Sequence, residues 1–221
     1  MVTIKLKSKG VRIDITLKKG NINIKNLGNS LQTEGFRISP SIPNMPTMAI
    51  SSSYKCLLGS DKLEVQAEDF FKLKSDLSQL QKVIHPYVEQ NNPYQINFES
   101  SFALSSKMAI TEIMEAIYNP RAKSRLKMFI EPIGFRIVIE HEKKPFILSF
   151  EGSRETNEAF CSIMFSTTDK NDFYRMSTNV DQVIDEFLKK LRFFAKNEKN
   201  YRLSRAKLVQ KKSEEKSGEP K

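Results

Sequence analysis

Hydrophobic and polar residues alternate with a period of two over the first 26 residues of the chain. Residues 3–7, 11–17 and 21–26 each place aliphatic side chains on one side and polar or charged side chains on the other. Gly10 and Gly20 interrupt this alternation, and glycine is common at tight turns. The pattern predicts a three-stranded antiparallel meander in residues 1–26.

The alternation becomes irregular in the proline-rich loop 27–47 and then returns. We predict a short strand at 36–38 and further strands at 48–59 and 62–66. A helical pattern follows, with Glu68 and Asp69 in its first turn and an end at 91–93. Its apolar positions recur every three or four residues, as in an amphipathic helix: Phe70, Leu73, Leu77, Leu80 and Ile84.

The second half of the chain repeats the order of strands followed by a helix. It begins with a predicted strand at 94–104 and a helix at 105–119. Four apolar, alternating segments then predict the strands 129–142, 144–152, 159–168 and 173–177. A final helix begins at Thr178, which approximates a capping box with Asp181. Its apolar stripe is Val180, Ile184, Phe187, Leu191 and Phe194.

These elements predict an α+β protein with two antiparallel meanders, each followed by an amphipathic helix. Pairing the two units, or laying a helix on each, would remove an apolar sheet face from water. We place an N-terminal unit at 1–92, a C-terminal unit at 93–198 and a disordered basic tail at 199–221. The alternative is an ordinary α+β protein with two unrelated strand-to-helix junctions.

Positive charge is concentrated at the two ends of the chain. The formal net charge is +10. Residues 1–26 hold seven Lys or Arg against one Asp, and residues 199–221 hold eight against three Glu. A surplus of this kind favours anionic partners such as nucleic acid. The tail would raise non-specific affinity, or could serve nuclear import or protein docking.

A basic sheet face beside aromatic rings suits single-stranded nucleic acid, because phosphates meet the charges and bases stack on the rings. Lysines would neutralise phosphates, Arg37 would orient the strand, and Phe36 or Tyr54 would stack. The alternative is that these lysines only keep the outer strand faces soluble and that the aromatic residues belong to the core. The candidate residues are Lys5, Lys7, Arg12, Lys18, Lys19, Lys25, Phe36, Arg37, Tyr54, Arg121, Lys123 and Arg125.

The sequence carries no recognisable catalytic or metal-binding signature. Nucleophile elbows, phosphate-binding glycine loops and zinc-ligand spacings are missing. Two lone histidines, His85 and His141, are interpreted as surface residues, and Cys56 and Cys161 as buried free thiols. We therefore expect no enzyme activity and no cofactor. An intracellular protein of a reducing compartment, cytoplasm or nucleus, without a membrane span is expected.

The two strand-to-helix junctions support a resemblance to a known family. The segments KLEVQAEDFFKLKSDL and FYRMSTNVDQVIDEFLKKL resemble the Whirly single-stranded-DNA-binding family and its relatives, the transcriptional positive-cofactor domain and the mitochondrial guide-RNA-binding proteins. The resemblance implies non-enzymatic binding of unpaired DNA or RNA across strand faces, usually as an oligomer. A second, weaker likeness is to a sliding-clamp half-domain, carried by the strand and helix of residues 94–117 and the strands that follow them.

The sequence thus favours a non-enzymatic protein that binds nucleic acid, single-stranded DNA or RNA above all, through a basic sheet face. The alternative function is a structural or assembly subunit that docks a protein partner, including a sliding-clamp-like ring subunit. A homo-oligomer is compatible with both functions.

Overall fold

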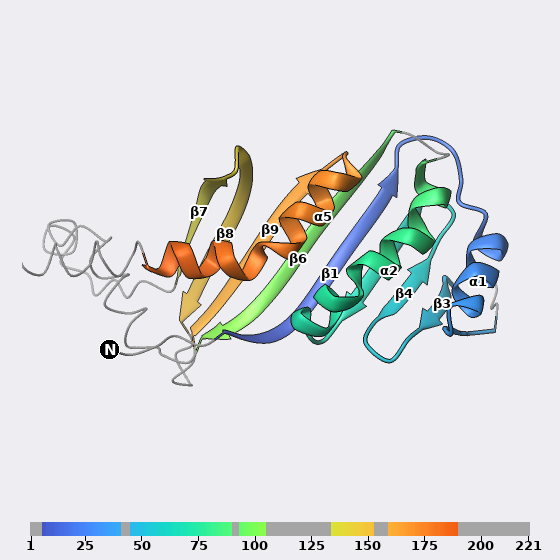
Figure 1. The fold of residues 1–221 in the computed structure, drawn as a ribbon, viewed down its shortest axis with the longest axis horizontal. Coiled ribbons are helices and arrows are strands. Elements are labelled where there is room, and N and C mark those ends of the chain that lie inside the picture. The colour runs from blue at the N-terminus through green and yellow to red at the C-terminus, as the bar shows by residue number, and fades with distance from the viewer. Residues whose placement is uncertain (1–5, 41–44, 90–92, 105–133, 153–158, 190–221) are drawn as a thin grey trace, which may run out of the picture.

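The structure is a computed structural model, which describes residues 6–40, 45–89, 93–104, 134–152 and 159–189. Nine antiparallel strands form one sheet in the order β2-β3-β4-β5-β1-β6-β9-β8-β7 (Figure 1). The strands are β1 (Leu6–Leu17), β2 (Arg37–Ile38), β3 (Thr47–Ile50), β4 (Lys55–Leu58), β5 (Lys62–Ala67), β6 (Tyr94–Leu104), β7 (Gly134–His141), β8 (Lys144–Gly152) and β9 (Ala159–Thr167).

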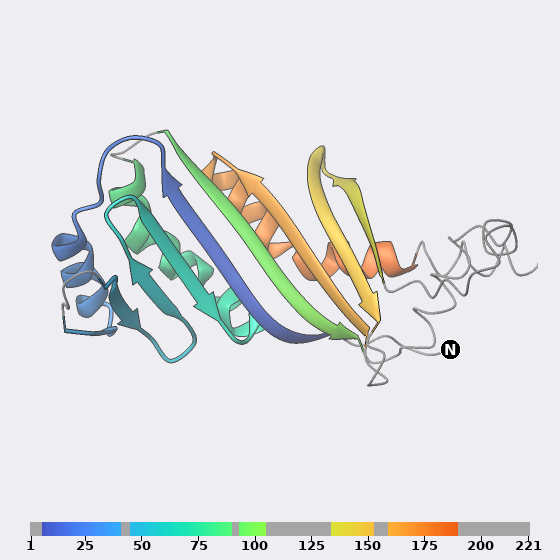
Figure 2. The same cartoon turned by 180° about the vertical axis from the view of Figure 1, so that it is seen from behind.

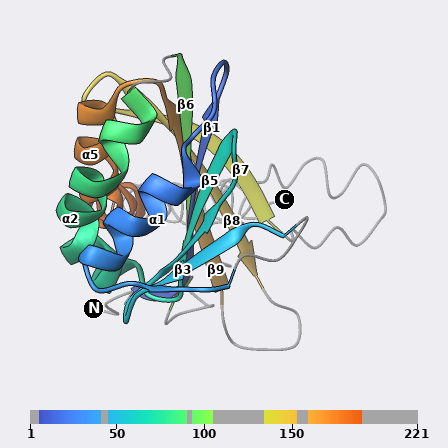
Figure 3. The same cartoon turned by 90° about the vertical axis from the view of Figure 1, so that its right-hand side faces the viewer.

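All described helices lie on one face of the sheet. They are α1 (Ile24–Thr33), α2 (Phe70–Glu89) and α5 (Lys170–Thr178), and a further helical segment covers residues 180–189. Figure 3 shows the helices on one side of the sheet, and Figure 2 shows the opposite side with no described helix over it. We call this opposite side the open face.

The core lies between the sheet and the helices. Inward residues of the strands meet the apolar stripes of α2 and of the helical segment 180–189, as the alternation and the helical spacing predict, and the buried side of α5 joins the same core. Phe98 of β6 sits at the centre, 2 % exposed. Its ring stacks on Phe165 at 4.8 Å and lies 6.3 Å from Phe70 of α2 and 6.4 Å from Phe173 of α5. One aromatic cluster therefore joins both halves of the chain.

The two halves are arranged around the central pair of strands, β1 and β6. β5 flanks β1 and leads into α2, while β9 flanks β6 and leads into α5. Both junctions use an aspartate at the same place. Asp69 Oδ1 accepts the backbone N–H of Phe71 at 2.8 Å, and Asp169 Oδ1 accepts that of Asn171 at 2.7 Å. The α+β fold with a helix after each set of strands is confirmed.

The meander predicted at residues 1–26 is wrong. Residues 6–17 form a single strand, because β5 and β6 pair with it on both sides and the expected turn at Gly10 is only a register shift in the β6 pairing. The last expected strand is instead the beginning of α1. Asn23 caps this helix by accepting the N–H of Asn26 at 3.0 Å, and Leu27 and Leu31 are fully buried.

Three other local predictions also require correction. The expected strand 48–59 is a hairpin of β3 and β4, in which Ser51 Oγ accepts the N–H of Tyr54 at 3.1 Å. The expected strand 173–177 is part of α5, because Asp169 caps a helix before it. Asp69 precedes α2 and is not in its first turn. The predicted helix 105–119 and the tail 199–221 lie outside the described residues.

Candidate functional site

The open face carries one row of side chains that crosses the whole sheet. Residues that are directly opposite in neighbouring antiparallel strands project on the same side. The pairing register therefore aligns the following residues across the nine strands: Arg37, Ile50, Lys55, Gln66, Arg12, Glu99, Met164, Ile147 and Val138. The row is basic toward β2, carries both signs at the centre and is apolar toward β7.

Charges at the middle of the open face compensate one another. Arg12 lies 3.1 Å from both Asp14 and Glu64, and Lys62 lies 3.1 Å from Asp14 and 3.6 Å from Glu64. The carboxylate of Asp14 raises the pKa of Arg12. These four residues form a closed ring of alternating charge. Arg12 is therefore exposed but already neutralised by neighbouring carboxylates, unlike the uncompensated cation that the sequence suggests.

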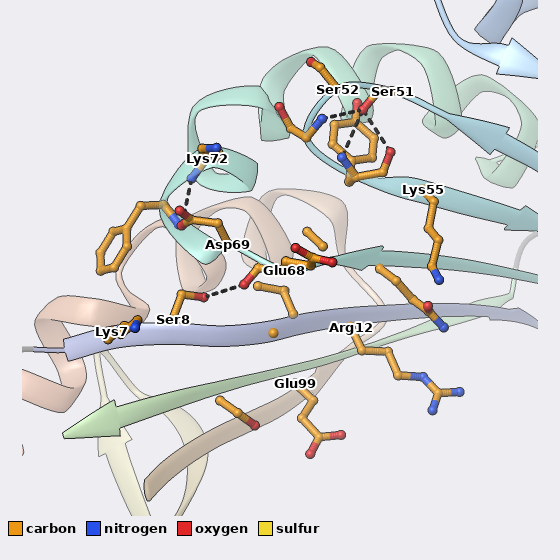
Figure 4. A pocket seen from close by; sticks show the side chains of 18 of the residues that line it. Lys7, Ser8, Arg12, Ser51, Ser52, Lys55, Glu68, Asp69, Lys72 and Glu99 are labelled. Carbon is orange, nitrogen blue, oxygen red and sulfur yellow. Dashed lines mark hydrogen bonds between the residues drawn. The ribbon is translucent and has the colours of Figure 1, made fainter. Parts of the chain in front are cut away.

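A cleft of about 1000 Å³ opens beside this ring, between the strands, the β3–β4 turn and the beginning of α2 (Figure 4). Lys7 of β1, Lys55 of β4 and Lys72 of α2 line it. All three are exposed, and none has an ion-pair partner among the described residues. Phe71, 43 % exposed, lines the same cleft. The cleft thus combines three lysines that lack a described ion-pair partner with an accessible aromatic ring.

Carboxylates also line the cleft, and they have different roles there. Asp69 Oδ1 accepts the backbone N–H groups of Phe71 and Lys72, at 2.8 and 3.4 Å, so it serves as the helix cap. Ser8 Oγ accepts the N–H of Phe70 at 2.7 Å. Because these groups occupy the α2 N-terminus, anion binding in the cleft would depend on the lysines. Glu68 and Glu99 are exposed in the cleft lining and do not attract an anion. The lysines are therefore the groups that would attract it.

The structure divides the candidate residues predicted from the sequence. Lys7, Arg12, Lys18, Lys19, Lys25 and Arg37 are exposed. Only Lys7 and Arg12 of this set line the cleft. Lys18 and Lys19 follow the opposite end of β1, roughly 35 Å from Lys7 at the rise of an extended strand. Lys25 is on α1 and Arg37 is on the edge strand β2, so the six do not form one cluster. Four candidates lie outside the described residues: Lys5, Arg121, Lys123 and Arg125.

The two predicted stacking aromatics are buried. Phe36 is 5 % exposed and Tyr54 is 6 % exposed, and their rings meet edge to face at 5.4 Å. Burial also raises the pKa of the Tyr54 hydroxyl. The predicted stacking role of either ring is therefore wrong, because core residues cover both rings. The sequence prediction did not include Phe71. Its position off the apolar stripe of α2 is the pattern that indicates an exposed ring.

The described residues contain no other obvious chemistry. No group of three or more His, Cys, Asp or Glu among them could hold a metal ion. His85 is buried on α2, so its interpretation as a surface residue is wrong, whereas His141 is at the end of β7, 3.6 Å from Glu186. Both cysteines are buried free thiols, and burial raises the pKa of Cys56 to about 12 and raises that of Cys161 as well. No described helix is long and apolar enough to cross a membrane.

Comparison with known proteins does not assign the chain to a family. No protein-family model matches it, and no curated protein matches it. Among solved structures, the regulatory subunit of aspartate kinase from Thermus flavus is 9 % identical over 80 % of this chain and 94 % of that chain, with a TM-score of 0.23. The ligand-free regulatory subunit from Thermus thermophilus is 8 % identical over 89 % and 97 %, also with a TM-score of 0.23. These values are too low to support an argument about fold or function.

Proposed function

We propose that the protein is a non-enzymatic nucleic-acid-binding protein and that single-stranded DNA or RNA binds in the cleft at the open face. The observation that carries the proposal is that Lys7, Lys55 and Lys72, none of them ion-paired among the described residues, line the same cleft as the partly exposed Phe71. The net charge of +10 supports the same partner through long-range attraction.

Each group has a separate role in this proposal. The three lysines neutralise successive phosphates and release counterions, which gives affinity without sequence preference. A base stacks on Phe71, an interaction that every base can make through its π-face. Glu68 and Glu99 repel phosphates and so direct the backbone toward the lysine side of the cleft. The charges of Arg12, Asp14, Lys62 and Glu64 cancel within their ring, so this ring does not compete with the lysines for phosphates.

Fluorescence anisotropy with labelled single-stranded DNA and RNA, at several salt concentrations, tests the proposal. Lys7→Gln, Lys55→Gln and Lys72→Gln together should lower affinity at least about tenfold at low salt. They should also reduce the slope of log affinity against log salt by about 2, since each single-strand contact contributes about 0.7. The matched control replaces the exposed Lys18, Lys82 and Lys143 by Gln, because these lie outside the cleft.

Phe71→Ala separates stacking from charge. It should lower affinity by about 1–3 kcal/mol while the salt slope stays constant. Equal losses in the two triple lysine variants would show that only the overall charge matters and would reject the cleft. A protein that binds neither labelled strand at low salt would reject nucleic-acid binding altogether.

The alternative is a subunit that docks a protein partner, and one feature of the open face favours it. Val138, Ile147 and Met164 border a groove of about 500 Å³, and Val138 is 70 % exposed. Ile147 and Met164 are half-buried, and a contiguous apolar patch at the surface is typical of protein-binding sites. A stable complex with another protein that survives nuclease and high salt during purification would favour this second function over the first.

A further inference from the structure

The two edges of the sheet differ in how well they are protected against pairing with another strand. β2, at one edge, has only two residues. β7, at the other edge, has eight residues, and no described strand pairs with its outer side. Soluble proteins usually keep edge strands short or covered, because an open edge presents unpaired N–H and C=O groups. The β7 edge is the long, unshielded one in the described part of the chain.

The turn after β7 fixes which of its backbone groups point outward. Glu142 and Lys143 form a two-residue turn with φ of 49° and 62°, the pattern of a type I′ hairpin. In such a hairpin the flanking residues His141 and Lys144 form a hydrogen-bonded pair. Hydrogen-bonded and non-bonded pairs then alternate along the strand. The backbone groups of residues 136, 138 and 140 therefore point away from β8.

The side chains of these same three residues share the open face. Arg136, Val138 and Glu140 are all exposed, with Val138 at 70 %. Ile137 and Ile139 face the helices and are partly buried against the core. The outward edge thus presents a positive, an apolar and a negative side chain, in that order and at equal spacing.

We propose that β7 pairs with β7 of a second copy of this chain, antiparallel and centred on Val138. In this register Arg136 lies opposite Glu140 of the second copy, and Glu140 lies opposite its Arg136. Val138 lies opposite Val138, and on the helix side Ile137 lies opposite Ile139. Two strands related by a two-fold axis make the same contact twice, so the surface is complementary to itself. The pairing joins two nine-stranded sheets edge to edge.

Other two-fold registers are disfavoured by the same side chains. Centring the pair on residue 136 or 140 keeps the hydrogen-bond phase but places Arg136 opposite Arg136 or Glu140 opposite Glu140. Like charges directly opposite each other destabilise a strand pair. Centring on Ile137 or Ile139 would match residues whose backbone groups already bond to β8. The centre at Val138 satisfies both the charges and the backbone.

The mass of the full chain in solution tests the proposal by size-exclusion chromatography with light scattering. The wild type should have twice the chain mass of 25.5 kDa at tens of micromolar protein. Arg136→Glu places two acidic pairs across the interface and should raise the dimer dissociation constant at least tenfold. The double variant Arg136→Glu/Glu140→Arg restores opposite charges in this register and should recover the dimer. Lys143→Glu makes the same charge change outside the pairing and should have no effect.

Cysteine trapping tests the register without relying on charge. Val138→Cys lies opposite itself, at a separation of about 5.5 Å between Cα atoms that a disulfide can span. Under mild oxidation it should give a covalent dimer on a non-reducing gel, whereas Lys143→Cys should not. The native Cys56 and Cys161 are buried and give the background. A wild type that is monomeric at every concentration, a dimer unaffected by Arg136→Glu, or no trapping at residue 138 would each overturn the proposal.

Discussion

At the scale of single residues, short polar side chains decide where the helices begin. Asp69 and Asp169 occupy the same position in the two strand-to-helix junctions, and each accepts two backbone N–H groups. In both cases the next intrahelical bond goes to the aspartate carbonyl, from Leu73 at 3.1 Å and from Phe173 at 3.0 Å. The surrounding residues differ, so the two junctions share a physical solution and not a sequence.

Removing either cap should destabilise the protein by a similar amount. Asp69→Ala and Asp169→Ala are each expected to lower the free energy of unfolding by about 1 kcal/mol, because two N–H groups lose their acceptor. Asp→Asn at the same positions should lose much less, since asparagine also caps well. Urea unfolding followed by circular dichroism measures the difference. Equal losses for Ala and Asn would show that charge, and not the cap, is what matters.

The burial of single residues shows where the alternating pattern predicts the inward side chains and where it does not. Leu63, Val65 and Ile13 are inward, as their period indicates. The predicted stacking of Phe36 or Tyr54 on a base requires that the ring points outward, yet both rings are in the core. The polarity of the residues next to a ring in the sequence does not predict whether a segment far away in the chain will bury that ring. In this case their rings pack against each other, so neither remains free to stack on a base.

At the scale of elements, ion pairs fasten the β7–β8 hairpin to α5. Asp172 of α5 accepts a hydrogen bond from Lys144 of β8 and lies 3.1 Å from Arg175. Arg175 in turn lies 3.7 Å from Glu142 in the hairpin turn. The hairpin that carries the proposed dimer edge is thus held from the helix side by charges at its turn.

The pKa of Asp172 should report this contact directly. The hydrogen bond from Lys144, together with the positive charge of Lys144 and Arg175, holds the Asp172 pKa below its usual value of 3.8. A lowered folded pKa favours the folded state above pH 3.8, and this contribution is lost as the pH falls through the folded pKa. Carboxyl ¹³C NMR titration should show the low pKa in the wild type and a return toward 3.8 in Lys144→Met. Identical titrations would mean that the contact does not form in solution.

At the scale of the whole molecule, the aromatic cluster makes the two halves one cooperative unit. Phe98 contacts rings from α2, β9 and α5, and β1 pairs with β6 along eleven residue pairs. A core that spans both halves cannot lose one half without exposing apolar surface in the other. The described residues should therefore unfold together.

Phe98→Ala tests this cooperativity. It should cost about 3–5 kcal/mol, because a ring in contact with three others leaves a cavity that the neighbours fill only partly. The wild type should show one transition by near-UV and by far-UV circular dichroism, and the variant should shift both by the same amount. Two separate transitions, with only one of them moved by Phe98→Ala, would show that the halves fold independently.

The sequence by itself determined what depends on neighbours along the chain. The period of two predicts β6, β8 and β9 close to their observed bounds, and the spacing of three and four predicts α2. It also located the cationic ends and one lysine of the cleft, Lys7. It did not separate the turn expected at Gly10 from a register shift inside a strand, because that difference depends on β5 and β6 pairing on both sides.

The tertiary structure alone decided which face stays open and which charges meet there. Lys55 and Lys72 come from different elements, and only the strand order and the α2 junction bring them into the same cleft as Lys7. The same folding neutralises Arg12 through Asp14 and Glu64 and buries Phe36 and Tyr54. Charge compensation and burial depend on contacts between residues far apart in the chain, and a local pattern of polar and apolar residues does not contain that information.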